Sequence, residues 1–521
     1  MLSPSKNTVM KATGIIAVTA AISKVLGFAR EMAIAYKFGS SWQTDAFNLA
    51  MSIPGLLFAA IATAIRTVFI PVFTDVATHK GKQRAFDLTN NVINTVLLIS
   101  LLLILLGEIF TAPLVHLFAR GFEGETFDLA VELTRIMLPV IIVFGLTGVI
   151  SGVLNALQEF TAPALVGFPY NILIIAGIFS LGSIYGIFGL AIATVIGISS
   201  QLLILIPSLR KTGYRYHFYL DLKAPELVLI LELMVPTLIG TAMNEINIMV
   251  DRMLASGLPE GSISALNYAS RLNGFPLGIV VSSVVTAIYP TMSHAAVTKD
   301  KKRFKESIDS SLRTMSFLVM PMMIGLMVLA TPITQVVYER GAFTSEATAA
   351  TSIALFYYSA GLLVASWRDV INRGFWSLKD TLTPMFISAG AVIINIIANL
   401  SLVGPMGHAG LALGTTIAAI FSSIISLIFL RKKTGPLGMR SILSSLLKIT
   451  IASGVMALVA IFGWQLVAPY AISGMRRVLL LFAVIGIAAI SYFLTAYILK
   501  VEEMDVARSL ARKVLGKISK R

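Results

Sequence analysis

The chain has 521 residues, of which 56% are hydrophobic and only 13% are charged. A soluble globular protein has about 25% charged residues, so this composition excludes a soluble enzyme. Intrinsic disorder is excluded as well, because so much apolar surface cannot stay solvated. Since one membrane crossing takes about 20 apolar residues, the composition predicts an all-α polytopic membrane protein.

The chain carries a formal net charge of +15 and has no cysteine. Membrane proteins concentrate Lys and Arg in their cytoplasmic loops, where these residues set the topology and meet anionic lipid. We therefore expect membrane lipid, and no nucleic acid, as the partner of this charge. The missing cysteines exclude disulfides and thiolate chemistry, and no HExxH or GxxxxGK[ST] motif indicates an enzyme.

Fourteen apolar segments of spanning length follow one another along the chain. They lie at residues 12–36, 43–75, 88–111, 128–156, 161–181, 184–208, 225–255, 262–294, 309–333, 347–377, 383–404, 408–430, 441–468 and 476–500. Clusters of Lys and Arg fall in loops on one side, with Arg476 and Arg477 as exceptions. This pattern predicts that both termini lie in the cytoplasm.

The sequence also contains an internal repeat. Matching residues are separated by 219 to 221 positions and pair Pro71 with Pro290, Ala112 with Thr331, Pro163 with Pro384 and Gly189 with Gly410. The nearly constant offset predicts that spans 1–6 and 7–12 are parallel copies of one six-helix unit. We therefore expect an N-terminal lobe at 1–222, a C-terminal lobe at 223–435, two extra helices at 436–502 and a basic cytoplasmic tail at 503–521.

Parallel repeats enclose a cavity on their pseudo-symmetry axis, which is the usual site of a transported substrate. The alternative is a duplicated scaffold whose two halves form a solid interface. Charged residues inside the spans favour transport, because a charge in the bilayer is costly and usually functional. The candidates are Lys24, Arg30, Glu31, Asp45, Arg66, Glu232, Glu245, Asp251, Arg252, Arg271, Arg368, Asp369 and Arg373.

Adjacent residues on a helix point in different directions, so neither Arg30 with Glu31 nor Asp251 with Arg252 is expected to form a simple intrahelical ion pair. Cations that reach a central cavity suit an anionic substrate, and guanidinium suits phosphate because it donates two parallel hydrogen bonds. The alternative is a set of interhelical salt bridges, with snorkelling near the membrane surfaces.

A second polar cluster lies in the eleventh and twelfth spans. Asn395 and Asn399 share a helix face, Leu411 and Thr415 have the same spacing, and Asp251 could complete the set. These oxygen ligands suit a hard cation such as Na⁺. The spacing alone favours polar contacts between helices.

Three motifs are specific: SKVLGFAREMAIAYKFG in span 1, TDAFNLAMSIP in span 2 and NYASRLNGFPLGI in span 8. With the plan of six, six and two spans, the chain resembles the MurJ lipid II flippase family of the multidrug/oligosaccharidyl-lipid/polysaccharide exporter superfamily. The resemblance implies a multi-pass protein of the bacterial cytoplasmic membrane. It would move undecaprenyl-diphosphate-linked disaccharide-pentapeptide to the outer leaflet by alternating access, for peptidoglycan synthesis.

The resemblance also assigns residues. Ser23, Arg30, Glu31 and Arg271 occupy motif positions of the family's pyrophosphate-binding cavity, Lys24 stands where the family often has Arg, and Asp45 matches an acidic position. Arg66 and Arg252 complete the candidate set, while Phe58 and Ala59 replace a basic pair. Some members bind Na⁺ at the positions of Asp251, Asn395, Asn399, Leu411 and Thr415, and Asn399 replaces an acidic ligand. Spans 13 and 14 would form a groove for the lipid tail.

Other functions stay open at this point. The chain could export another polyprenyl-linked oligosaccharide or act as a MATE-like drug antiporter, or it could be a non-transporting cell-wall scaffold. The two extra spans and the phosphate-suited cations count against a drug antiporter. We expect a monomer whose partners are lipid II and membrane lipids, with cell-wall synthesis proteins as further candidates, and no cofactor other than Na⁺ as a coupling or structural ion.

Overall fold

The computed structural model describes residues 6–471 and 474–504. Within these ranges it describes the side chains except at residues 6–18, 20–21, 57–66 and 235–244. Internal contacts divide the chain into two compact units. They are Met1–Ser264 with Arg340–Thr344, and Ala265–Glu339 with Ser345–Arg521.

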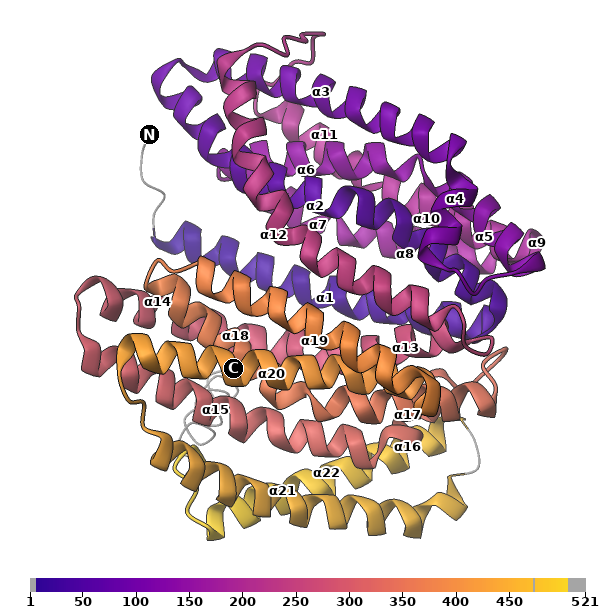
Figure 1. Cartoon of the computed structure of the whole chain (residues 1–521), viewed down its shortest axis with the longest axis vertical. Helices are drawn as coiled ribbons and strands as arrows, with labels where there is room; N and C mark the ends of the chain where they lie inside the picture. The colour runs from indigo at the N-terminus through magenta and orange to yellow at the C-terminus, as the bar shows by residue number, and fades with distance from the viewer. Residues whose placement is uncertain (1–5, 472–473, 505–521) are drawn as a thin grey trace. The chain divides into compact units, whose positions relative to one another are not determined.

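The first unit is built from helices joined mostly by short loops, and a longer loop over residues 212–224 connects α11 to α12 (Figure 1). They are α1 (Lys6–Phe38), α2 (Trp42–His79), α3 (Lys82–Ile109), α4 (Thr111–Phe118), α5 (Gly124–Met137), α6 (Val140–Ala156), α7 (Thr161–Leu165), α8 (Gly167–Phe179), α9 (Leu181–Ile184), α10 (Gly186–Ser199), α11 (Gln201–Lys211) and α12 (Pro225–Ala255). Ser41 begins α2 with a capping box, in which its side chain and that of Thr44 satisfy each other's backbone amides. α2 is central, because it packs against α3, α5, α6 and α12.

The second unit continues from the first turn of α13. Its elements are α13 (Ser262–Pro276), the π-helix η1 (Leu277–Val281), α14 (Ser282–Val297), α15 (Lys301–Val328), α16 (Ala330–Tyr338), α17 (Ser345–Ala360), α18 (Leu362–Ser377), α19 (Leu382–Met406), α20 (His408–Thr434), α21 (Met439–Val467), the 3₁₀ turn η2 (Ala468–Tyr470) and α22 (Gly474–Ile498). α15 packs against α21, and α21 packs against α22. In Figure 1 these last two helices lie side by side at the yellow end of the colour bar.

The helices fit the predicted membrane spans. Within the described residues, ten helical segments are long and apolar enough to cross a membrane, and the pair α17 and α18, bent by 42°, adds an eleventh. α1, α2 and α12 have 33, 38 and 31 residues and carry many of the charges that the sequence places inside spans. The eleven candidate spans together with α1, α2 and α12 overlap the fourteen predicted spans, so the helices are consistent with that count.

The outer faces of the helices are apolar, as lipid contact requires. On α22, Leu481 and Tyr492 are buried, whereas Leu479, Phe482 and Ile490 are exposed. A water-soluble helix would carry polar residues on that exposed face. The chain is therefore a multi-pass helical membrane protein, which confirms the predicted fold class.

The two contact units do not share the boundary of the predicted lobes. α12, which the repeat assigns to the second lobe, lies in the first contact unit because it packs against α2. A repeat boundary follows sequence equivalence and a contact boundary follows packing, so the lobes at 1–222 and 223–435 stay a prediction.

Candidate substrate-binding residues and an apolar groove

Arg30 on α1 is held by groups on two helices. Its Nη1 donates to Oδ1 of Asn171 at 3.1 Å, and its Nη2 lies 2.7 Å from Oε1 of Glu31. The guanidinium carbon lies 4.9 Å from the centre of the Tyr170 ring, in cation–π range. These contacts fix the guanidinium plane, which prepares its remaining N–H groups to recognise a planar pair of oxygens.

The predicted absence of an ion pair between Arg30 and Glu31 is wrong. Their Cα–Cβ bonds diverge by about 100° around the helix. The three methylenes of the arginine nevertheless let the guanidinium fold back to the neighbouring carboxylate. Only 12% of the Arg30 side chain and 7% of the Glu31 side chain are exposed, so burial favours this charge pairing.

Asn171 on α8 organises this cluster, although it is not among the residues predicted for the site. Its Nδ2 donates to the carbonyl of Gly167 at 2.7 Å, which leaves Oδ1 facing Arg30. The signal was present, because Asn171 is a polar residue within an apolar span. A Cβ built on Gly167 would lie 2.8 Å from Oγ of Ser23, so the serine hydroxyl packs on the backbone of α8. Lys24, by contrast, is exposed.

Asp45 is buried and accepts two backbone hydrogen bonds. Oδ2 accepts from the amide of Gly261 and Oδ1 from the amide of Ser264, both at 2.7 Å. These amides lie at the start of α13, so the carboxylate caps this helix from α2. Asn48 strengthens the contact through a 3.1 Å hydrogen bond from its Nδ2 to Oγ of Ser264, and the carbonyl of Asn48 accepts from Arg252.

The remaining candidates are spread over both units. Arg271 is exposed on α13, the helix that Asp45 caps. The side chain of Arg66 lies outside the described residues. Arg373 stacks on Tyr289 and Trp376 at 5.3 and 4.6 Å, which supports a position near a membrane surface.

The proposed sodium ligands of the second unit lie on the tightly packed pair α19 and α20. Asn395 and Asn399 are buried, and Nδ2 of Asn399 donates to Oδ1 of Asn395 at 2.9 Å. The hydroxyl of Thr415 donates to the carbonyl of Leu411 at 3.1 Å. No cluster of three His, Cys, Asp or Glu side chains suited to a metal ion occurs in the described part of the chain.

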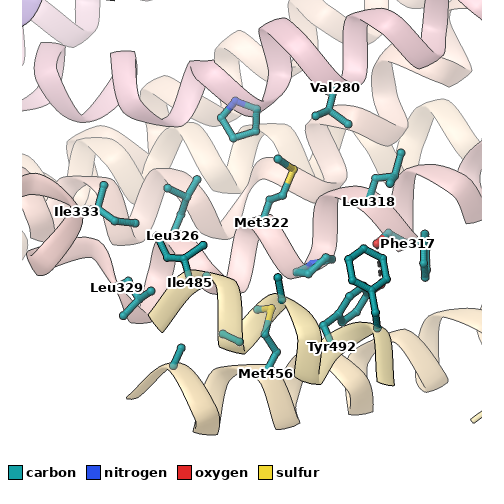
Figure 2. Close-up of a pocket in the computed structure, with 17 residues that line it drawn as sticks. Val280, Phe317, Leu318, Met322, Leu326, Leu329, Ile333, Met456, Ile485 and Tyr492 are labelled. Carbon is teal, nitrogen blue, oxygen red and sulfur yellow. Dashed lines mark hydrogen bonds between the residues drawn. The ribbon is translucent and has the colours of Figure 1, made fainter. Parts of the chain in front are cut away.

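An apolar cavity of about 410 Å³, here named the apolar groove, lies within the second unit, between α15, α21 and α22 (Figure 2). Phe317, Met322, Leu326, Met456 and Tyr492 all line it. The hydroxyl of Tyr492 donates to the carbonyl of Phe317 at 2.7 Å, so this polar atom is satisfied within the wall. The cavity therefore suits a hydrocarbon chain, as the predicted tail groove requires.

The fold resembles solved transporters. An inward-facing MATE family multidrug transporter of the MOP superfamily matches with a TM-score of 0.67 at 15% identity, over 80% of this chain and 98% of its own. This likeness shows the fold, which is the multi-pass helical architecture of that solved structure. A solved lipid II flippase MurJ in an inward closed conformation matches with a TM-score of 0.80 at 29% identity, over 94% of this chain and 99% of its own.

The sequence identifies the family. The family model described as lipid II flippase MurJ matches residues 34–482. The lipid II flippase MurJ of Burkholderia cenocepacia is 31% identical over 422 residues, which cover 79% of this chain and 82% of that protein. The probable lipid II flippase MurJ of Bdellovibrio bacteriovorus is 29% identical over 97% of this chain and 98% of its own. The chain therefore belongs to the MurJ lipid II flippase family, as predicted, and is a transporter.

Proposed function

We infer that the chain is a lipid II flippase, which moves the lipid-linked peptidoglycan precursor across the bacterial cytoplasmic membrane. The observation that carries this inference is the family match over residues 34–482, joined to a TM-score of 0.80 against a solved MurJ. A diphosphate with sugars and a peptide cannot cross about 30 Å of hydrocarbon unaided, because each buried charge costs several kcal/mol. Alternating access lowers this cost, because polar and charged side chains of the protein bind the headgroup while it crosses the membrane.

We propose that Arg30 and Arg271 each bind the diphosphate, supported by Ser23, Lys24, Glu31, Arg66 and Arg252. For Arg30 the support is its fixed guanidinium plane, held by Asn171, Glu31 and Tyr170. For Arg271 it is the exposed position on a capped helix. Asp45 serves as a positioning residue, because its carboxylate holds the start of α13, which carries Arg271.

The apolar cavity between α15, α21 and α22 is proposed to hold part of the undecaprenyl chain. Its lining is apolar. Because the surrounding lipid is also apolar, a polyprenyl chain gains free energy on entering this cavity only from its packing contacts with the wall. This groove favours a polyprenyl-linked substrate over the drugs that MATE proteins carry.

The finer features of topology and coupling are also proposals. The basic loops on one side support a topology with the N- and C-termini in the cytoplasm. We propose that the protein acts as a monomer with two repeated lobes and that its protein partners are cell-wall synthesis proteins. Na⁺ is proposed as the coupling ion. Oxygen atoms from Asn395, Asn399, Leu411 and Thr415 fit a hard cation, and Asp251 would add the negative charge.

The test is complementation in a bacterial strain depleted of its own flippase, at equal expression of each variant. Arg30→Ala and Arg271→Ala should each fail to support growth, and lipid II should accumulate in the inner leaflet. Arg303→Ala, at an exposed position in the first turn of α15, is the matched control and should grow normally. Normal growth with both Arg30→Ala and Arg271→Ala would contradict the proposed diphosphate site. Failure of the unaltered chain to restore lipid II export would overturn the proposed function itself.

A further inference from the structure

A second cavity, of about 630 Å³, opens at the start of α21 in the second unit. Its polar wall is formed by Arg313, Arg440, Ser441, Ser444, Lys448 and Glu502. None of these residues belongs to the proposed diphosphate site. The cavity is therefore a separate polar site on the helices that also line the apolar groove.

The acidic groups near this cavity are already paired. Arg313 forms salt bridges with Asp309 at 3.1 Å, with Glu503 at 3.3 Å and with Glu502. Glu503 is buried and also accepts a 2.7 Å hydrogen bond from the hydroxyl of Ser445. One arginine thus engages all three carboxylates. Of these only Glu502 lines the cavity, where it faces three cations, Arg313, Arg440 and Lys448.

Arg440 and Lys448 form no ion pair with a carboxylate in the described part of the chain. Arg440 is exposed and has no ion-pair or hydrogen-bond partner in the described part of the chain. Nζ of Lys448 donates to the carbonyl of Lys500 at 3.3 Å, a contact that adds no negative charge. Ser444 lies between them at the i+4 position, so two cations and a hydroxyl form one stripe on α21. Together with the exposed hydroxyl of Ser441, this wall offers hydrogen-bond donors to an anion with several acceptor oxygens, which is the chemistry of phosphate.

The polar cavity and the apolar groove follow one another along the same two helices. On α15, Arg313 in the polar wall precedes Phe317 in the apolar wall by one turn. On α21, Lys448 precedes Met456 by two turns, about 12 Å at 1.5 Å per residue. Figure 1 shows α15, α21 and α22 running together, and Figure 2 shows the apolar wall that they form. A ligand that fills both parts has a phosphate at one end and a hydrocarbon chain at the other.

We propose that this cavity binds the phosphate headgroup of a lipid whose chain enters the apolar groove. Two kinds of lipid carry this chemistry, the phosphodiester of a bilayer phospholipid and the phosphate of a polyprenyl carrier. Arg440 and Lys448 bind the phosphate oxygens, and Ser441 and Ser444 donate to those that remain. The proposal does not depend on transport, because binding is measured directly.

The experiment measures lipid retention by native mass spectrometry on the full-length protein in detergent. The probes are dioleoyl phosphatidylglycerol, dioleoyl phosphatidylcholine, undecaprenyl phosphate and undecaprenol. The double variant Arg440→Gln with Lys448→Gln should lose about tenfold in affinity for at least one of the two anionic probes, because two charge-assisted contacts disappear. Binding of undecaprenol, which has no phosphate, should change less than twofold. Phosphatidylcholine, whose choline cation offsets the charge of its phosphate, should lose less affinity than phosphatidylglycerol.

The matched control is Lys302→Gln with Arg303→Gln, which removes two exposed cations from α15 outside the cavity. It should bind every probe like the unaltered protein. A loss for phosphatidylglycerol alone assigns the site to bilayer phospholipid, and a loss for undecaprenyl phosphate assigns it to the carrier. The proposal is overturned if the double variant binds both anionic probes normally, or if the control loses them equally. Since these readouts are independent of growth, failure here leaves the flippase assignment intact.

Discussion

The amide of Ala342 donates a 2.8 Å hydrogen bond to the carbonyl oxygen of Tyr36, at the end of α1. The equivalent loop of the other repeat makes a related contact, in which the amide of Gly121 donates to Oγ of Ser256 at 3.0 Å, at the end of α12. Both contacts lie within the first unit. The loops that contain Arg120–Gly121 and Arg340–Gly341 therefore each dock on the end of the helix that begins the other repeat.

This docking predicts that Gly341→Ala is strongly destabilising. Gly341 has φ +62°, and a Cβ built on it would lie 2.3 Å from the carbonyl oxygen of Tyr36. We expect a loss of about 1–3 kcal/mol from the collision, in addition to the left-handed backbone penalty. Gly186→Ala is the control, because Gly186 has φ +57° and open space around its Cβ position. Thermal unfolding of the purified protein should show a larger fall in Tm for Gly341→Ala, and equal shifts would refute the collision.

Asp45→Asn should weaken both folding and growth. An asparagine keeps one acceptor oxygen but presents an NH₂ group to a backbone amide of Gly261 or Ser264, so one buried donor loses its partner. The expected cost is about 1–3 kcal/mol. The measurement pairs Tm with complementation of a flippase-depleted strain. Asp75→Asn on the same helix is exposed and should behave normally, and a normal Asp45→Asn variant would exclude the capping role.

Asn171→Ala should impair transport through Arg30. Without the amide oxygen, the guanidinium keeps Glu31 and Tyr170 but loses the contact that fixes its plane. We expect roughly a tenfold lower rate of lipid II translocation in reconstituted vesicles, which corresponds to one hydrogen bond of about 1.4 kcal/mol. Ser180→Ala removes an exposed hydroxyl at the end of the same helix and should have no effect. An unchanged rate for Asn171→Ala would show that Arg30 needs no such support.

Asp380 and Lys433 predict a pH dependence of stability. Burial raises the pKa of Asp380, but the ammonium of Lys433 at 2.6 Å and two hydrogen bonds from Thr383 outweigh it and hold the pKa at about 2. A carboxyl group with a lowered folded-state pKa stabilises the protein above its unfolded pKa of about 4, and this contribution is lost as the pH falls toward 2.

The variant Lys433→Met should therefore have a lower Tm than the unaltered protein at pH 7. The difference should shrink between about pH 4 and pH 2, because the carboxyl group becomes protonated in both proteins. Lys432→Met removes the neighbouring exposed charge and serves as the control. A Tm difference that stays constant down to pH 2 would contradict this pairing.

Coupling to Na⁺ predicts that Asp251→Asn reduces Na⁺-stimulated lipid II translocation in vesicles. The loss of the one proposed carboxylate ligand removes the negative charge that attracts the cation. Glu125→Gln, an exposed change near the start of α5, should leave the stimulation unchanged. Translocation that ignores Na⁺ in the unaltered protein, together with a harmless Asp251→Asn, would remove the ion site.

Part of the site could be predicted from local patterns and part could not. Arg30 stands out because a charge in an apolar helix is rare whatever surrounds it. Its partner Asn171 lies 141 positions away, and no local spacing joins the two. The same limit applies to Asp45, whose carboxylate suggests substrate binding in the sequence but caps α13 in the folded chain.

The sequence by itself determined the membrane class, the helical spans, the repeat and the family. These depend on hydropathy, on a constant offset and on short motifs, all of which are properties of the chain before it folds. Only the tertiary structure decided which groups each charge meets, including the pair of Arg30 with Glu31 and the carboxylates that engage Arg313. The physical reason is that side-chain length and distant backbone donors set these contacts, and neither is encoded in the spacing of neighbouring residues.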